Sequence, residues 1–326
     1  MDIFDLLTLV FGLSLFLFGM NIMSDTIKQS AGDSLKLLLE KLTDKPLRGF
    51  FLGFAVTALV QSSSATTVMV VGFVDSGAML LRQAVSVIMG ANVGTTATSW
   101  LTALAGLEES GGVSSFMRWL KPSSFTPIIS LVGLVFYMSA KKPKRKGIGL
   151  IMLGFSVLMI GMETMSSSVA ELSENEAFRS ILLRFENPIL GVLAGLVITA
   201  IVQSSSASIG ILQSFTATGA ITLGSAVPRI MGQNIGTCVT AIISSVGIGK
   251  NAKRAAFIHL LFNVIGSVVC LALFYVFSGF IPNNILHGSI DMWGIAIAQT
   301  LFKIITAIIL FPLSRQLEKV ALRTVR

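Results

Sequence analysis

The sequence predicts an all-α polytopic membrane protein built from two inverted-topology repeats. Three observations lead to this fold class: a high hydropathy, an internal duplication, and an odd number of predicted crossings in each half. Of the 326 residues only 12% are charged, and the mean hydropathy is +0.83. A soluble domain carries about 25% charged residues. The apolar residues come in blocks and do not alternate, which favours helices that cross a lipid bilayer over a β-barrel.

Seven apolar segments are expected to cross the bilayer, three in each half and one at the end. They are residues 6–23, 83–105, 124–140, 148–162, 225–247, 257–277 and 293–313. The two cysteines, Cys238 and Cys270, lie in apolar stretches and indicate neither a disulfide framework nor a metal site.

A shift of 142 residues aligns 46–98 with 188–240 without a gap, and 24 of these 53 positions are identical. Fixed-offset similarity of this kind indicates a duplication. Two polar blocks recur: Q-S-S-S, and a G-x-N-x-G-T sequence inside an apolar segment. The duplicated blocks are the first candidates for function.

Residues 46–76 and 188–218 each have a Q-S-S-S block between two apolar arms of about 12–15 residues. A crossing helix needs about 20 residues, so each segment is expected to be a re-entrant hairpin. Backbone that turns inside a membrane must be buried in protein or line a wet cavity.

Three crossings per half place the second repeat upside down relative to the first. The expected organisation is a first repeat at 1–140, a basic cytoplasmic linker at 141–146, a second repeat at 147–280, and a last helix with a cytoplasmic tail at 281–326. With the N-terminus outside, 18 of the 24 Lys and Arg residues fall in cytoplasmic segments, as the positive-inside rule requires. That rule also explains the net charge of +8 without a nucleic-acid partner. Residues 24–42, which include Lys28, are expected to form an interfacial amphipathic helix.

The serine triplets can begin the second arm of each hairpin, because serine is a good helix N-cap. A helix N-terminus with free N–H groups and hydroxyls attracts anions, and inverted repeats commonly bind substrate near the membrane midplane. Arg229, inside the second repeat, could add a positive charge or could reach the membrane interface instead. The alternative role for the serines is close helix packing. The candidate anion-binding residues are Gln61, Ser62, Ser63, Ser64, Gln203, Ser204, Ser205, Ser206 and Arg229.

The G-x-N-x-G-T blocks, Gly90–Thr95 and Gly232–Thr237, weaken the helix and predict a broken transmembrane helix at 83–105 and at 225–247. Unwound carbonyls and nearby side-chain oxygens suit Na⁺, whereas a simple kink would need no ligand. Asn263 follows in an apolar segment with His259, and Lys303 is expected to pair with another helix or line a subunit contact. The candidate sodium ligands are Gln61, Ser64, Asn92, Thr95, Gln203, Ser206, Asn234, Thr237 and Asn263.

The doubled Q-S-S-S-A, each followed by M-G-x-N-x-G-T, resembles the type II sodium-dependent phosphate cotransporter family. The K-R-A-A-F-I-H-L-L-F-N segment after the second repeat is similar as well. The resemblance implies sodium-driven import of inorganic phosphate, with both ions held around the two Q-S-S-S blocks, in a homodimer. The short basic linker is typical of a bacterial member, which would lie in the inner membrane. Na⁺ is then the co-transported ion, and no organic cofactor is expected.

Four alternatives are weighed against sodium–phosphate import: transport of another oxyanion, phosphate export, a phosphate-sensing membrane scaffold, and a serine hydrolase. The hydrolase is excluded because a serine nucleophile needs an adjacent base, and neither His259 nor His287 lies in a duplicated or nucleophile-elbow context. The sequence therefore predicts a transporter and not an enzyme.

Overall fold

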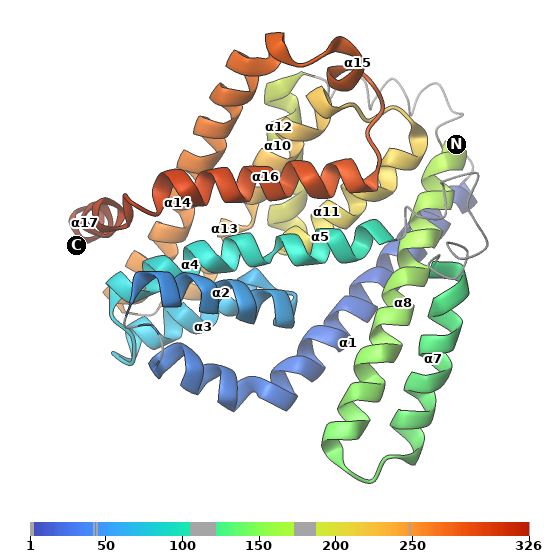
Figure 1. Cartoon of the computed structure of the whole chain (residues 1–326), viewed down its shortest axis with the longest axis horizontal. Coiled ribbons are helices and arrows are strands. Elements are labelled where there is room, and N and C mark those ends of the chain that lie inside the picture. The colour runs from blue at the N-terminus through green and yellow to red at the C-terminus, as the bar shows by residue number, and fades with distance from the viewer. Residues whose placement is uncertain are drawn as a thin grey trace.

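The computed structural model describes residues 3–41, 43, 45–104, 122–172, 187–247 and 249–325, and nearly all of these are helical (Figure 1). Residues 173–184, which at the sequence level are expected to occupy the place on the outer side that matches 24–42, lie outside the described residues. In the first part the helices are α1 (Ile3–Lys41), α2 (Pro46–Val60), α3 (Ser63–Asp75), α4 (Leu81–Gly94), α5 (Thr96–Ala103) and α7 (Pro122–Ser139). In the second part they are α8 (Pro143–Leu172), α10 (Pro188–Val202), α11 (Ser205–Ser214), η2 (Phe215–Thr218), α12 (Leu223–Gly236), α13 (Cys238–Ser245), α14 (Lys250–Phe277), η3 (Ser278–Phe280), α15 (Asn283–Leu286), α16 (Met292–Leu310) and α17 (Ser314–Thr324).

The helix bounds recur at the offset found in the sequence. Helices α2, α4 and α5 match α10, α12 and α13 residue for residue after a shift of 142, and α3 begins where α11 does. Proline sits at the first turn of both α2 and α10, where its missing N–H removes no helical hydrogen bond. The duplicated sequence therefore folds twice into the same order of helices, a short helical hairpin followed by a longer helix with a break.

Helices α1 and α8 lie side by side, with α7 along the outer side of α8 (Figure 1). Glycines allow this close approach: a Cβ on Gly19 would meet backbone atoms of Leu158 and Gly154, and one on Gly161 would meet Phe16 and Gly12. Packing of this kind, without side chains between the backbones, is a common way for helices to associate in lipid.

Glycines also allow close contact between each hairpin and the broken helix that follows it. A Cβ on Gly90 of α4 would fall on the Phe50 carbonyl of α2, and a Cβ on Gly232 of α12 would fall on the Val192 carbonyl of α10. The glycines of the G-x-N-x-G-T blocks thus serve close helix contact.

The predicted break in each of these segments is present, but the expected unwinding is not. Helix α4 continues through Gly94 and α12 through Gly236, and the breaks are the single residues Thr95 and Thr237, which keep right-handed helical φ and ψ. The backbone of each block is buried, and helical hydrogen bonds satisfy its carbonyls, whereas unwound carbonyls would need other partners. Each block therefore interrupts its helix only slightly.

Four described helical stretches are long and apolar enough to cross a membrane: Leu6–Ser30, Pro143–Ser168, Lys250–Phe280 and Met292–Leu310. Residues 24–41 are helical, as predicted, but they continue α1 without a break and do not form a separate helix. The hairpin helices α2, α3 and α10 are apolar but shorter than a membrane span, as the arms of the predicted hairpins should be.

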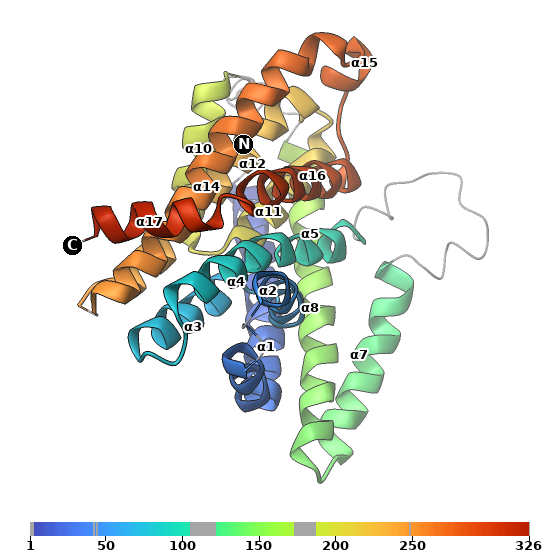
Figure 2. The same cartoon turned by 60° about the vertical axis from the view of Figure 1, so that its left-hand side comes forward.

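Contacts between the two parts are reciprocal. Gly12 contacts Gly161, and Gly19 contacts Gly154. At the 142-residue offset Gly12 is equivalent to Gly154 and Gly19 to Gly161, so each contact is the counterpart of the other. In the same way α5 packs on α11, and their counterparts α13 and α3 pack on each other. A second view shows α4 and α5 leading from the first hairpin toward α11 (Figure 2).

Candidate functional site

Each hairpin turns at its glutamine. Gln61 has φ 59° and ψ 23°, and Gln203 has φ 56° and ψ 21°. Among the described residues these are the two non-glycine positions with positive φ. A left-handed conformation costs a residue with a side chain about 1–2 kcal/mol, and such strain tends to be retained at functional sites.

Serine side chains then begin the second arm of each hairpin. The Ser62 hydroxyl accepts a hydrogen bond from the Ala65 backbone N–H, and Ser204 accepts one from Ala207, both at 3.2 Å. A buried hydroxyl pair fixes the arms below each turn: Thr57 donates to Thr66 at 3.0 Å, and Thr199 donates to Ser208 at 2.7 Å. With Ser62 and Ser204 used as caps, the next hydroxyl of each triplet is left for other partners.

The two turns meet at one cavity of about 260 Å³. Its lining includes all eight residues of the duplicated block, namely Gln61, Ser62, Ser63, Ser64, Gln203, Ser204, Ser205 and Ser206. Ser63 and Ser205 are nearly buried, and among the described residues no group hydrogen-bonds to either hydroxyl. The cavity thus combines the N-termini of α3 and α11 with free hydroxyls, which suits an anion.

The cavity wall also has polar atoms without partners. The Oε1 atom of Gln61 and the Oγ atom of Ser24 are buried at the cavity wall with no hydrogen-bond partner in the described part of the chain. A buried polar group left unpaired costs about 1–3 kcal/mol. The Gln61 oxygen can only accept and favours a bound cation or a protonated oxyanion, whereas the Ser24 hydroxyl can also donate to an anion.

The other candidate residues do not line this cavity. Arg229, 7% exposed, lies on α12 where that helix packs on α10. The Thr95 and Thr237 hydroxyls donate to backbone carbonyls four residues earlier in their own helices, at 3.2 and 2.9 Å. Asn234 is buried on α12, and its Nδ2 has no partner among the described residues.

Lys303 occupies the oxygens of two predicted sodium ligands. Its ammonium donates to Asn92 Oδ1 at 3.0 Å and to Asn263 Oδ1 at 3.3 Å, and all three side chains are buried. The expected pairing of Lys303 with another helix is confirmed, since it joins α16 to α4 and α14. The same contacts leave Asn92 and Asn263 engaged with a fixed cation in this structure.

Helix α1 forms a third wall of the cavity, which was not predicted from the sequence. Asn21, Ser24 and Lys28 line it together with Leu17 and Met20. Their spacing of three and four residues places the three polar side chains on one face of a helix. That spacing could have indicated a polar face directed at protein, but it fits the interfacial helix predicted at 24–42 equally well.

Comparisons with known proteins agree with the duplicated motif. The family model of the Na⁺/Pi-cotransporter matches residues 15–167 and again residues 158–281. The chain is 30% identical over 307 residues to "Uncharacterized protein YqeW" of Bacillus subtilis, covering 92% of this chain and 91% of that protein. No solved structure matches.

Two further relatives have names that state a function. "Putative inorganic phosphate export protein YjbB" of Salmonella typhimurium is 27% identical over 267 residues, 82% of this chain and 46% of that protein. "Sodium-dependent phosphate transport protein 2A" of Rattus norvegicus is 32% identical over 167 residues, 48% of this chain and 26% of that protein. The chain thus spans half or less of the length of these two relatives.

The family is one of transporters and not of enzymes, in agreement with the prediction from the sequence. Its model matches both repeats, which carry the two Q-S-S-S turns and the cavity between them. On this evidence, the chain belongs to the Na⁺/Pi-cotransporter family.

Proposed function

We propose that the protein is a sodium-coupled secondary transporter that imports inorganic phosphate by alternating access. The observation that carries this proposal is the cavity of about 260 Å³ into which both duplicated Q-S-S-S turns project. Phosphate would lie between Ser63 and Ser205, against the N-termini of α3 and α11. The positive partial charges of these termini and the free hydroxyls complement an oxyanion.

Sodium is proposed to bind beside phosphate at the same turns, through Gln61, Ser64, Gln203 and Ser206. The unpaired Oε1 of Gln61 supports this location, because oxygen acceptors are the ligands of hard cations. The engaged oxygens of Asn92 and Asn263 argue against a sodium site there. A cation next to phosphate raises its affinity, and linkage requires phosphate to raise sodium affinity equally.

The two repeats are proposed to have inverted topology, with α2–α3 and α10–α11 as re-entrant hairpins. The reciprocal contacts support this: Gly12 with Gly161 and Gly19 with Gly154 are the pairs that a local two-fold axis would produce. Inverted repeats around a midplane site are typical of secondary transporters. We further propose that the protein lies in a bacterial inner membrane as a homodimer, with its N-terminus outside and its C-terminus in the cytoplasm.

Export is the second candidate, because a relative matching 82% of this chain is named for phosphate export. The two directions share one site and differ in which gradients drive the cycle. A reconstituted system in which both gradients are set by the experimenter can therefore separate them.

The test is uptake of ³²P-phosphate into proteoliposomes that contain the purified protein. An inward Na⁺ gradient should drive phosphate accumulation, and an equal K⁺ gradient should not. Phosphate accumulation that K⁺ drives equally well would reject sodium coupling. Phosphate movement that only an outward phosphate gradient drives, whatever the Na⁺ gradient, would favour export.

A further inference from the structure

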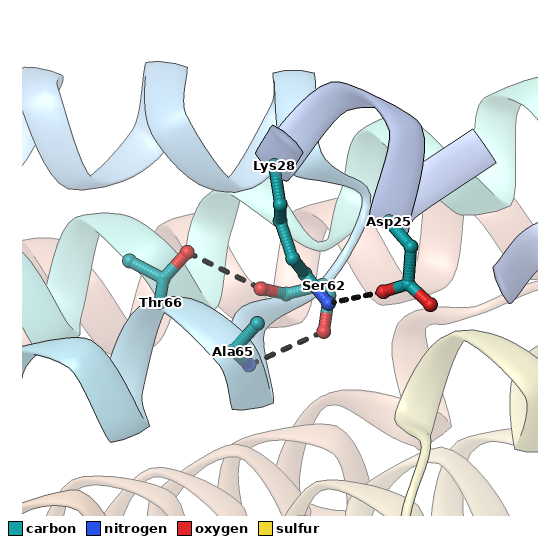
Figure 3. Close-up of polar contacts among 5 residues, drawn as sticks. All are labelled: Asp25, Lys28, Ser62, Ala65 and Thr66. Carbon is teal, nitrogen blue, oxygen red and sulfur yellow. Dashed lines mark hydrogen bonds and ion pairs between the residues drawn. The ribbon is translucent and has the colours of Figure 1, made fainter. Parts of the chain in front are cut away.

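The α1 wall supplies the charged side chain of the cavity. Among the described residues that line the cavity, Lys28 alone is charged. Figure 3 shows its side chain extending from α1 toward Ser62 of the first turn, with Asp25 beside the ammonium. A cavity for a phosphate anion otherwise has only neutral donors, so this ammonium has the strongest attraction for a negative ligand.

Lys28 is held in place by a weak bond. Its Nζ lies 3.1 Å from Asp25 Oδ1, and the two side chains are 38% and 65% exposed. An exposed ion pair three residues apart on a helix is weakened by water and contributes little to stability. A phosphate dianion in the cavity, already bound by hydroxyls and helix N-termini, can therefore compete with Asp25 for the ammonium.

A second feature of the same helix face points independently to a ligand. Ser24, one turn before Lys28, is 5% exposed and lines the cavity. Its hydroxyl has no hydrogen-bond partner among the described residues. Buried hydroxyls are normally paired, so this one is prepared for a group that enters the cavity.

The charge of this wall has no counterpart in the second repeat. At the 142-residue offset, Asn21 corresponds to Glu163, which does not line the cavity, Ser24 to Ser166, and Lys28 to Ala170. The duplicated turns supply the neutral donors from both repeats, whereas the positive charge comes from the first repeat alone. The charge therefore breaks the symmetry of the cavity.

We propose that Lys28 binds the transported oxyanion directly, exchanging Asp25 for the substrate, with Ser24 donating to the same anion. The proposal rests on the proposed function and deepens it, since it names the cation of the site. Asp25 then acts as a competitor for Lys28: it orients the ammonium in the empty cavity and weakens anion binding by its own negative charge.

Because Lys28 attracts the anion and Asp25 competes for Lys28, replacing them should change the KM for phosphate in opposite directions. In proteoliposomes with an inward Na⁺ gradient, Lys28→Gln should raise the KM for phosphate by about tenfold or more, since a charge-assisted hydrogen bond is lost. Lys28→Arg should recover most of this loss. Asp25→Asn should lower the KM by about twofold or more, because the ammonium is released toward the cavity. Lys141→Gln, an exposed lysine away from the cavity, is the matched control and should leave the KM unchanged.

Two results would overturn the proposal: a Lys28→Gln KM within twofold of the wild type, or equal shifts in the same direction for Lys28→Gln and Asp25→Asn. The second result is what a structural ion pair would give. Equilibrium dialysis with ³²P-phosphate on the detergent-solubilised protein provides a readout that does not need transport. Binding that is lost in Lys28→Gln without any sodium-driven flux in the wild type would support Lys28 and reject the proposed transport. Wild-type flux with unchanged Lys28→Gln binding would reject Lys28 alone.

Discussion

Gln61 and Gln203 combine two roles that are usually divided between residues. Their backbones take the left-handed conformation that ends α2 and α10, where glycine is the common choice. Their side chains line the cavity, which a glycine could not do. A strained residue that keeps its side chain in a cavity is better explained by a requirement for that side chain than by folding alone.

Lys303 shows the opposite case, a residue whose position argues for stability. Replacing it by methionine keeps most of the volume and leaves the oxygens of Asn92 and Asn263 without their donor. We expect Lys303→Met to lower the free energy of unfolding by about 1–3 kcal/mol, the cost of unsatisfied buried acceptors. The measurement is thermal unfolding of the purified protein in detergent.

Lys319→Met is the control for this variant, since Lys319 is exposed on α17 and its replacement should have little effect. An unfolding midpoint for Lys303→Met equal to that of the control would show that the contacts with Asn92 and Asn263 do not stabilise the fold.

At the scale of helices, glycine sets the distance between each hairpin and its longer helix. Gly90 and Gly232, at equivalent positions, let α4 and α12 touch the carbonyls of α2 and α10. Because the contact is with backbone atoms, no side-chain rotation can make room for a Cβ. The hairpins are thus fixed against α4 and α12, which positions their turns at the cavity.

Gly90→Ala should therefore force α2 away from α4 and lower the free energy of unfolding by about 1–3 kcal/mol, the usual cost of overpacking. Gly72→Ala in α3 is the matched control. A Cβ at Gly72 meets nothing within 4 Å, and alanine favours helix by up to about 1 kcal/mol. Unfolding in detergent measures both variants, and a Gly90→Ala protein as stable as Gly72→Ala would disprove this packing role.

The hairpins were predictable because their evidence is local: a polar tip, two short apolar arms and proline at the start of α2 and α10. Ser63 and Ser205 line one cavity, and their proximity was expected from the family resemblance, which places both ions around the two Q-S-S-S blocks. The wall formed by α1 was not predictable, because Lys28 has the same sequence surroundings whether its helix lies at the membrane interface or lines a cavity. The unwinding at Gly90 was wrong because glycine in a helix serves either flexibility or close contact, and only the neighbouring helix decides which.

For the whole molecule, the reciprocal contacts between the repeats are the main structural support for inversion. Inversion predicts that equivalent ends of the two hairpins face opposite sides of the membrane. Ala78 and Ala220 follow the first and second hairpins at the 142-residue offset, and each is at least partly exposed.

Single Ala78→Cys and Ala220→Cys variants should react with a membrane-impermeant maleimide from opposite sides, Ala78→Cys from the cytoplasm and Ala220→Cys from outside. The native Cys238 and Cys270 are buried, so background labelling should be low. Intact cells and inside-out vesicles provide the two sides. Labelling of both variants from the same side would contradict inverted topology.

The central claim is that the two Q-S-S-S turns form one phosphate site and not two. Equilibrium binding of ³²P-phosphate to the purified protein in saturating Na⁺ tests it most directly. We predict one phosphate per chain, with affinity reduced in both Ser63→Ala and Ser205→Ala by about 1–3 kcal/mol, the contribution of a hydrogen bond to a charged ligand. Two phosphates per chain, or wild-type affinity in either variant, would contradict a single shared site.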